Sequence, residues 1–347
     1  MKRMLSYPEA INEAIAQEMG CDKTVILMGQ GVDDPKGTIG STKGLVDKFG
    51  GERVFDTPVA EDGMTGVAIG TALGGLRPIH VHIRMDFMLL AMNQIVNMAA
   101  KMRYMSGGAV SVPIVIRALI GKSWGQGPQH SQSIYPLLMN IPGLKIVAPV
   151  TPYDAKGSLI AAIRDNNPVI FIEHRLLYYQ KGYVPKKLYA ALLGKARLLS
   201  KGDDITLVGI SQMAIECLRA KKYLEEVGIK AEVIDPLSLY PLDIATIEKS
   251  VLKTGRLIVV DNAWSCCAAA SEIFTQLTER GKLNNFKFAR MGFEFVPCPT
   301  TPVLEKEFYP DARKIAIRAY ELVKRVKNKW QPKTKLQIEE IEFKGPF

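Results

Sequence analysis

The stretch from Phe55 to Gly75, FDTPVAEDGMTGVAIGTALGG, constrains the fold most strongly. It predicts a short buried strand that ends at Thr57, because Pro58 cannot continue a hydrogen-bonded ladder, followed by a helix whose first turn carries Glu61. Four glycines recur on one face of this helix at spacings of three and four, namely Gly63, Gly66, Gly70 and Gly74. Each costs about 1 kcal/mol relative to alanine in a helix interior. We therefore expect another backbone to approach this face, and a ligand site at the mouth of the strand.

The remaining chain alternates apolar runs with helical patterns, which is typical of α/β folds with parallel, buried strands. Apolar runs without alternation occupy residues 24–32, 78–83, 113–118, 145–150 and 168–174, and a long amphipathic helix is expected over 86–105. A second strand and helix series begins after an irregular, basic stretch. The predicted organisation is an α/β domain over 1–180, a basic linker over 181–203, a second α/β domain over 204–327 and an extended or disordered tail over 328–347.

Composition excludes several classes of protein. The net charge of +10 is concentrated in residues 181–201 and 311–347, without a basic stripe of interleaved aromatic residues, so nucleic-acid binding is not expected. No uncharged apolar run of membrane-spanning length occurs, and the first residues lack the apolar core of a secretion signal; a cytoplasmic protein is expected. The five cysteines show no metal-ligand spacing and are interpreted as free thiols. The adjacent pair Cys266–Cys267 and Trp264 are interpreted as packing residues rather than redox groups.

Three histidines are candidates for function. His80 and His82 lie on one face of the strand over 78–83, where interior or pocket-lining roles are favoured over a metal, because no third ligand joins them. His130 lies between the strand over 113–118 and a predicted serine-capped helix. Open α/β sheets bind ligands at such junctions, outside the carboxyl ends of their strands.

A series of motifs resembles one enzyme family. In order they are DTPxxExG, AxGGLRPI, NQIxNxAAKxRYMSGG, VPIVIR, QHSQ, PGLKIVAP, DAKG, IRDNNPVI, DPLSLYPLD and SVLKTGRLIVV. Together they resemble, over about residues 5–325, the beta subunit of the thiamine diphosphate-dependent component of 2-oxo-acid dehydrogenase complexes, of the pyruvate and branched-chain type. The resemblance implies a pyrimidine-binding α/β domain followed by a transketolase-type C-terminal domain.

The resemblance also implies roles for individual residues. Glu61 matches the glutamate that hydrogen-bonds a ring nitrogen of the cofactor's aminopyrimidine, Ile83 and Phe87 match residues that line this ring, and His130 matches an active-site histidine. Five positions match a structural potassium site: Ile114, Ala162, Ile163, Asp165 and Asn167. An ordinary helix end at RDNNP is the alternative interpretation of these five positions.

An absent motif implies a partner chain. Family members hold the diphosphate through Mg²⁺ on a GDG motif followed by an Asn, and this sequence has no GDG. The resemblance therefore implies a separate alpha subunit that carries this half of the site, most simply as two alpha and two beta chains. The glycine face of the helix over 61–75 is then expected to be an intersubunit contact.

Departures from the family pattern leave the reaction open. Gln30 and Gly31 replace an acidic pair after the first strand, and His80, His82 and Arg84 are expected to face the substrate pocket, where they suit an anionic or sugar-like oxo compound. The leading hypothesis is acyl transfer from a 2-oxo acid to a lipoyl group, with a lipoyl acyltransferase as a possible further partner. The alternatives are a split transketolase-like or acyloin-forming enzyme, and a catalytically silent scaffold subunit.

Overall fold

A computed structural model describes residues 3–122, 125–282, 285–327 and 329–334, which form two compact units. The first unit comprises the described residues up to Gly121 together with Leu137–Leu193. The second comprises the described residues of Lys122–Pro136 and those from Gly194 onward. The predicted tail lies outside the described residues from 335 on.

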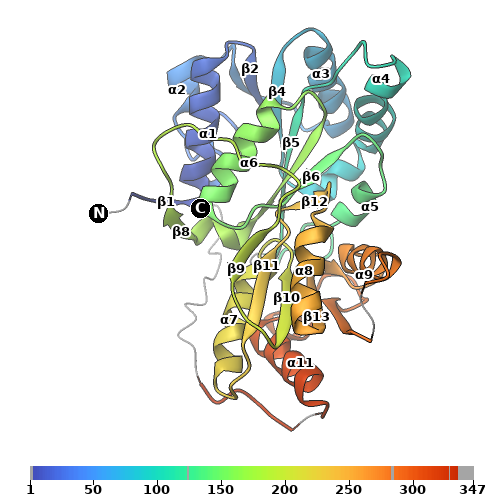
Figure 1. Ribbon diagram of the computed structural model, residues 1–347. Coiled ribbons are helices and arrows are strands. Elements are labelled where there is room, and N and C mark those ends of the chain that lie inside the picture. Colours follow the sequence, from blue (N-terminus) through green and yellow to red (C-terminus); the bar gives the residue numbers. More distant parts are fainter. Residues whose placement is uncertain (1–2, 123–124, 283–284, 328, 335–347) are drawn as a thin grey trace. The chain divides into compact units, whose positions relative to one another are not determined.

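The first unit is built on a sheet of parallel strands in the order β6-β7-β5-β4-β2-β3 (Figure 1). These strands are β2 (Val25–Gly29), β3 (Val54–Asp56), β4 (Arg77–His82), β5 (Val115–Ile120), β6 (Lys145–Val147) and β7 (Val169–His174). The predicted buried strands are confirmed in this sheet. Every residue of β2, β5 and β7 is buried, because helices cover both faces of the sheet.

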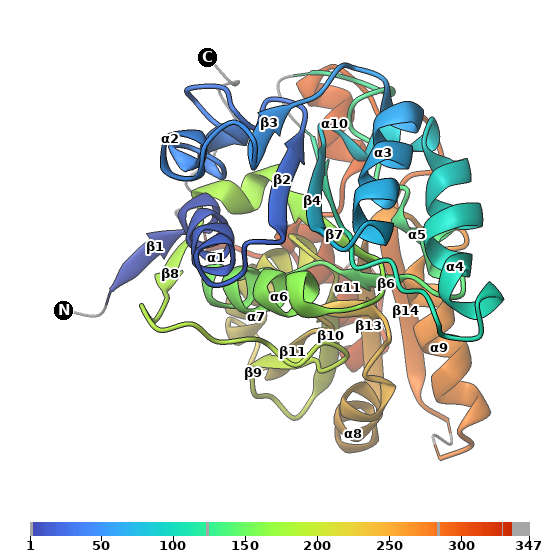
Figure 2. The same cartoon turned by 90° about the horizontal axis from the view of Figure 1, so that it is seen from above.

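Helices α1 and α6 pack together on one face of this sheet, and α3 and α4 lie on the other (Figures 1 and 2). The helices of this part of the chain are α1 (Tyr7–Cys21), α2 (Leu45–Phe49), α3 (Glu61–Leu73), α4 (Ala100–Met105), α5 (Tyr135–Met139) and α6 (Pro152–Arg164). Local signals explain where they begin. Ser6 and Glu9 form a capping box at α1, and the Thr151 side chain accepts a hydrogen bond from the Asp154 backbone at α6.

The predicted single helix over 86–105 is wrong in its first half. Residues Met85–Leu89 form a 3-10 helix, η2, in which the Phe87 amide donates to the Arg84 carbonyl at 3.1 Å. A π-helical turn, η3 (Gln94–Ala99), then leads into α4. Both segments bury apolar residues, Met85 and Met88 in η2 and Ile95 and Ala99 in η3, so side-chain periodicity alone does not distinguish them from a regular α-helix.

The second unit contains a five-stranded sheet in the order β14-β13-β10-β11-β9, in which only β9 is antiparallel. Its strands are β9 (Arg197–Ser200), β10 (Ile205–Gly209), β11 (Ala231–Asp235), β13 (Arg256–Trp264) and β14 (Lys287–Phe293), and a short β12 (Ser238–Tyr240) follows β11 in the chain. Its helices are α7 (Met213–Glu225), α8 (Ile244–Thr254), α9 (Ala269–Glu279), α10 (Pro302–Phe308) and α11 (Ala312–Lys324).

Neighbouring residues of β10 pack against different helices of the second unit. Ile205 and Leu207 share a core with α7 and α11, whereas the Thr206 hydroxyl lies 2.7 Å from that of Ser250 on α8. Successive strand residues point to opposite faces. Helices α7 and α11 therefore cover one face of this sheet, and α8 covers the other.

Several stretches are more ordered than the sequence indicated. Within 181–203, β8 (Lys181–Tyr183) pairs with β1 (Met4–Ser6), and β9 forms an edge of the second sheet. Between β14 and α11 the chain also forms α10, which the sequence did not predict. Residues 329–334 lie along the second unit, where the backbone amides of Lys333 and Thr334 donate to Glu226. Among the described residues no helix is long and apolar enough to cross a membrane.

Candidate active site

Three neighbouring strands, β4, β2 and β3, bring their carboxyl ends to one edge of the first sheet. In this register Gly29 lies beside both Asp56 and Val81. Gly29 is required for this close pairing, because a Cβ there would lie 2.4 Å from the Val81 carbonyl oxygen. The next residues along each strand, Gln30, Thr57 and Ile83, therefore surround the position where ligands bind in open α/β sheets.

Glu61 is the first residue of α3 and lies at this edge. Its side chain is 7% exposed, and its Oε1 accepts a hydrogen bond of 3.1 Å from Gln30 Nε2. The helix N-terminus also favours a carboxylate. Glu61 therefore lies in the first turn of the helix, as the sequence predicted, but the sequence did not show its hydrogen bond with the amide of Gln30.

Ile83 and Phe87 border the same edge and are half-buried. A Cβ on Gly31 would lie 3.8 Å from Ile83 Cδ1, so Ile83 sits next to the segment that holds Glu61. One oriented carboxylate beside partly exposed apolar side chains matches the needs of an aminopyrimidine ring, which has polar ring nitrogens and apolar faces. These residues fit the pyrimidine end of thiamine diphosphate.

His80 and His82 are enclosed between β4 and α3. Both side chains are 2% exposed, and their Nε2 atoms lie 3.3 and 3.2 Å from the Thr65 hydroxyl, one helical turn beyond Glu61. Burial lowers the pKa of His80 to about 4 and lowers that of His82 well below its usual value, so both rings are neutral near pH 7. Among the described residues no cluster of three metal-ligating side chains occurs.

Arg84 follows Ile83 directly and is also buried. Burial lowers the pKa of its guanidinium to about 10, and the nearby Asp86 carboxylate partly offsets this effect. The guanidinium therefore remains charged near neutral pH, and it is a cation at the same strand end as the candidate cofactor residues.

His130 lies in the second unit, on a segment held by several contacts. Tyr135 donates a short hydrogen bond to the buried Asp261 carboxylate, and Cys298 Sγ lies 3.6 Å from the Ser131 carbonyl oxygen. Burial raises the pKa of Asp261 to about 6. The predicted serine-capped helix after His130 instead begins at Tyr135. Asp261 lies far away in the sequence, so no local signal predicted this anchor.

Comparisons with known proteins identify the architecture. Residues 3–181 match the transketolase pyrimidine binding domain, and residues 194–315 match the transketolase C-terminal domain. The chain belongs to the transketolase family. The predicted fold class and the predicted resemblance are therefore confirmed.

Within this family, the similar proteins include beta subunits of two kinds. The chain is 44% identical to the acetoin:2,6-dichlorophenolindophenol oxidoreductase subunit beta of Cupriavidus necator, over 93% of this chain and 99% of that protein. It is 43% identical to the pyruvate dehydrogenase E1 component subunit beta of Gracilaria tenuistipitata var. liui, over 86% and 93% of the two chains. A solved split gene transketolase, described as an inactive beta4 tetramer, shares the fold with a TM-score of 0.75 at 20% identity, over 92% of this chain and 99% of that chain.

Four of the five positions predicted for potassium lie in the last turn of α6 and directly after it in this transketolase-family chain, and Ile114 lies directly before β5. Their oxygens already accept hydrogen bonds: Val169 donates to the Ile114 carbonyl at 2.9 Å, and Asp165 donates to the Ala162 carbonyl at 3.2 Å. Arg77 donates to the carbonyl of Ile163 at 3.0 Å. Asn167 donates to the Asp165 carboxylate through its side-chain amide at 2.8 Å. Two cationic side chains also contact this set, because Lys145 pairs with the Asp165 carboxylate and Arg77 donates to the Asp165 carbonyl at 3.2 Å. Each carbonyl oxygen keeps a second lone pair with which it could contact a monovalent cation.

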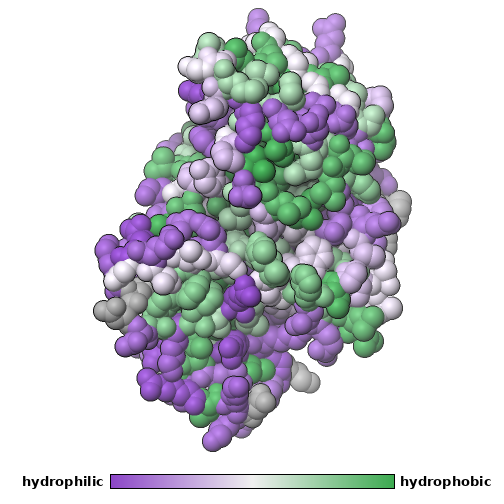
Figure 3. Space-filling model, turned by 90° about the vertical axis from the view of Figure 1, so that its right-hand side faces the viewer, coloured by the Kyte–Doolittle hydropathy of each residue, from purple (hydrophilic) through white to green (hydrophobic). Residues whose placement is uncertain are grey.

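The glycine face of α3 is largely open within the chain. A Cβ at Gly63 or Gly70 would meet no atom within 4 Å, and one at Gly66 would meet only the Gln94 side chain, at 3.5 Å. Exposed apolar residues surround this face on α3 and in the following segment: Val67, Leu73, Leu89, Leu90, Met98, Tyr104 and Met105. Figure 3 shows apolar side chains gathered over the first unit on this side. The backbone expected against this face is not found among the described residues.

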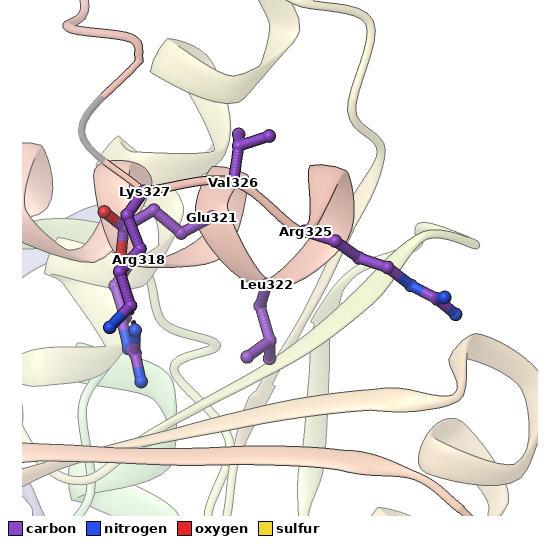
Figure 4. A pocket seen from close by; sticks show the side chains of 6 residues that line it. All are labelled: Arg318, Glu321, Leu322, Arg325, Val326 and Lys327. Atoms are coloured by element: carbon purple, nitrogen blue, oxygen red, sulfur yellow. Dashed lines mark hydrogen bonds and ion pairs between the residues drawn. The ribbon is translucent and has the colours of Figure 1, made fainter.

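A separate pocket lies at the end of α11, in the second unit (Figure 4). Its lining residues are Arg318, Glu321, Leu322, Arg325, Val326 and Lys327. Arg318 and Lys327 lie side by side, whereas Arg325 points away from them. Arg318 pairs with Glu321 at 3.2 Å, one helical turn along α11. The pocket contains none of the predicted site residues.

Proposed function

We propose that this chain is the beta subunit of a thiamine diphosphate-dependent enzyme that decarboxylates a 2-oxo acid and transfers the acyl group to a lipoyl acceptor. The observation that carries the proposal is the buried Glu61 carboxylate, held by Gln30 at the carboxyl ends of β2, β3 and β4. The pyruvate dehydrogenase and acetoin oxidoreductase beta subunits among its relatives support an enzyme rather than a scaffold.

The residues of this chain would serve the pyrimidine half of the cofactor. When bound, thiamine diphosphate supplies a carbon acid whose conjugate base adds to carbonyl groups. Glu61 would bind a pyrimidine ring nitrogen and hold a proton there, and Gln30 would keep the carboxylate in place. Ile83 and Phe87 would flank the ring and exclude water. His130 would orient the acceptor or donate a proton to it.

An alpha subunit would complete the site. The sequence has no GDG motif to hold Mg²⁺ and the diphosphate. The open glycine face of α3 and its apolar surroundings support a contact with another chain, most simply in an assembly of two alpha and two beta subunits. A lipoyl acyltransferase is the proposed acceptor-bearing partner, and a cytoplasmic location is proposed for the complex.

Cleavage of an acyloin is a second candidate reaction. It is supported by two relatives named as acetoin oxidoreductase beta subunits, at 44% and 42% identity. Arg84 supports the first candidate, because a charged guanidinium favours a carboxylate substrate over neutral acetoin. His80 and His82 would stabilise the substrate pocket indirectly, through their contacts with the Thr65 hydroxyl. The variant Arg84→Met should raise KM for a 2-oxo acid and leave KM for acetoin nearly unchanged.

The activity test uses this chain reconstituted with the GDG-bearing subunit from the same source. Glu61→Gln should lower kcat by about 10²- to 10⁴-fold, the range for loss of an acid–base group. Asp62→Asn is the matched control, because Asp62 is the next residue of α3 and its side chain is exposed. Pyruvate with lipoamide and acetoin with a dye acceptor distinguish the two reactions. Equal activity of the Glu61→Gln variant and the wild type would contradict the proposal.

We also propose that potassium occupies the five-residue oxygen site at the end of α6. Binding to the folded chain alone stabilises it by mass action. The melting temperature should therefore be higher in potassium chloride than in tetramethylammonium chloride at the same ionic strength. Asp165→Asn should remove this difference, because it removes the only formal negative charge of the set. The same melting temperature in both salts would show that no potassium binds.

A further inference from the structure

We propose that Cys266 and Cys267 form a reversible dithiol site that low-molecular-weight disulfides oxidise to an intrachain disulfide. The two residues lie in the turn between β13 and α9 of the second unit. None of the candidate cofactor residues belongs to this turn, and the proposal does not depend on the proposed function.

The two thiols are close together and accessible. Both side chains are exposed, and their Sγ atoms lie 3.8 Å apart, close to van der Waals contact. The packing interpretation is therefore wrong for these thiols. It holds for Trp264, whose ring lies 5.9 Å from that of Phe293 and whose Nε1 donates to the Val296 carbonyl at 2.8 Å.

No other pair of thiols in the chain offers this arrangement. Cys217 and Cys298 are buried, and Cys21 is exposed but belongs to the first unit, far from the turn in the sequence. Cys267 has a left-handed backbone, with φ of 51°. This backbone conformation is uncommon for residues other than glycine. Here it occurs where the two sulfur atoms of adjacent side chains are close together.

The reactivity of the pair toward disulfides depends on pH, because the thiolate is the form that attacks a disulfide. The hydrogen bond with Cys267 raises the pKa of the Cys266 thiol, and Arg290 opposes this effect. A thiol that keeps its proton near neutral pH reacts slowly as a nucleophile. Exchange should therefore become faster as the pH rises.

A disulfide between these residues would be easy to reduce. Adjacent Cα atoms are about 3.8 Å apart across a trans peptide bond, which is shorter than the roughly 4.4–6.8 Å found in most disulfides. Strained, exposed disulfides have higher reduction potentials than structural ones and are therefore labile. An excess of a reduced monothiol should therefore reduce this disulfide back to two thiols.

The reaction balances without any further reactant. One cysteine thiolate attacks a small disulfide, forming a mixed disulfide and releasing one thiolate. The second cysteine, as its thiolate, attacks the sulfur of the first and releases the second small thiolate. The two leaving groups take up the two protons that the cysteines lose. The cysteine pair is oxidised by two electrons, and the small disulfide is reduced to two thiols.

The test exposes the full chain to glutathione disulfide, blocks the remaining thiols by alkylation and maps the peptides by mass. The wild type should lose two hydrogens in the peptide that contains both cysteines and should carry no glutathione there. Cys21, which has no neighbouring thiol, should carry a glutathione adduct in the same sample. Excess reduced glutathione should restore two alkylatable thiols at the pair.

Single substitutions separate ring closure from simple adduct formation. Cys266→Ser and Cys267→Ser should each retain a stable glutathione adduct on the remaining thiol, and Cys21→Ser should behave as the wild type at the pair. Phenylarsine oxide, which binds two thiols together, should be retained by the wild type and by Cys21→Ser in the presence of a monothiol and should be lost from the other two variants. Stable glutathione adducts on the wild-type pair, or no modification there, would overturn the proposal.

Discussion

At the level of single residues, the candidate site depends on pairs that are distant in the sequence. The family motif identified Glu61, which lies in the first turn of α3 as expected and is buried there. The motif did not reveal that Gln30 holds this carboxylate, because the contact joins residues from two elements. The anchoring of Tyr135 by Asp261 was hidden for the same reason. One sequence taken alone carries no signal for such tertiary pairs.

The buried histidines predict how stability depends on pH. The pKa of His80 is about 4 in the folded chain and about 6.5 in the unfolded chain, so between these pH values the unfolded chain binds more protons. Stability should therefore fall as the pH decreases from about 6.5, by up to about 1.4 kcal/mol per pH unit for this group. The double variant His80→Asn, His82→Asn should show a weaker dependence than the wild type in urea unfolding between pH 7 and pH 5.

The comparison with the variant is needed because a second buried group, Asp261, changes the stability with pH in the opposite direction. Burial raises the pKa of Asp261 to about 6, so this carboxyl favours the folded chain as the pH decreases through that value. Asp261 is present in both proteins, and its contribution cancels in the difference. Parallel stability curves for the two proteins would show that the histidines are not held neutral by burial.

At the level of elements, the sequence predicted those strands and helices that hydrophobic runs and capping residues determine locally. The parallel strands, α1 with its capping box and α6 with its Thr151 cap follow from such local patterns. The 3-10 segment at Met85–Leu89 and the π segment at Gln94–Ala99 could not be predicted in this way. Both bury apolar residues as a regular helix would. Short edge strands such as β1 and β8 exist only as a pair, and neither has a signal of its own.

The open face of α3 leads to a prediction about assembly. Gly70 lies in the helix interior, and a Cβ there would have no atom within 4 Å, so Gly70→Leu should fold and gain about 0.5–1 kcal/mol in stability as an isolated chain. The added side chain should block the proposed contact with another subunit. Analytical ultracentrifugation with the GDG-bearing subunit should therefore show loss of the complex.

The control substitution for this experiment is Gly20→Leu. Gly20 also lies in a helix, α1, is exposed and has no atom within 4 Å of its Cβ position. It lies outside the glycine face, so this variant should assemble as the wild type does. Equal assembly of the Gly70→Leu and Gly20→Leu variants would place the subunit contact elsewhere.

At the level of the whole molecule, the sequence predicted two α/β domains, and the matches to a transketolase pyrimidine binding domain and a transketolase C-terminal domain agree with that fold. The assignment of the described residues of Lys122–Pro136 to the second unit was not predicted, because this segment lies within the range of the first domain in the sequence. Its placement depends on contacts such as the Tyr135–Asp261 hydrogen bond, which link residues far apart in the chain. The sequence has no GDG motif, so the proposed site contains residues for one end of the cofactor only.

Calorimetric titration with thiamine diphosphate and Mg²⁺ tests the half-site most directly. Three samples are compared: this chain alone, the GDG-bearing subunit alone and the two together. Saturable binding should appear only with both subunits, and Glu61→Gln in the pair should weaken it while Asp62→Asn does not. Tight binding of thiamine diphosphate to this chain alone would contradict the account.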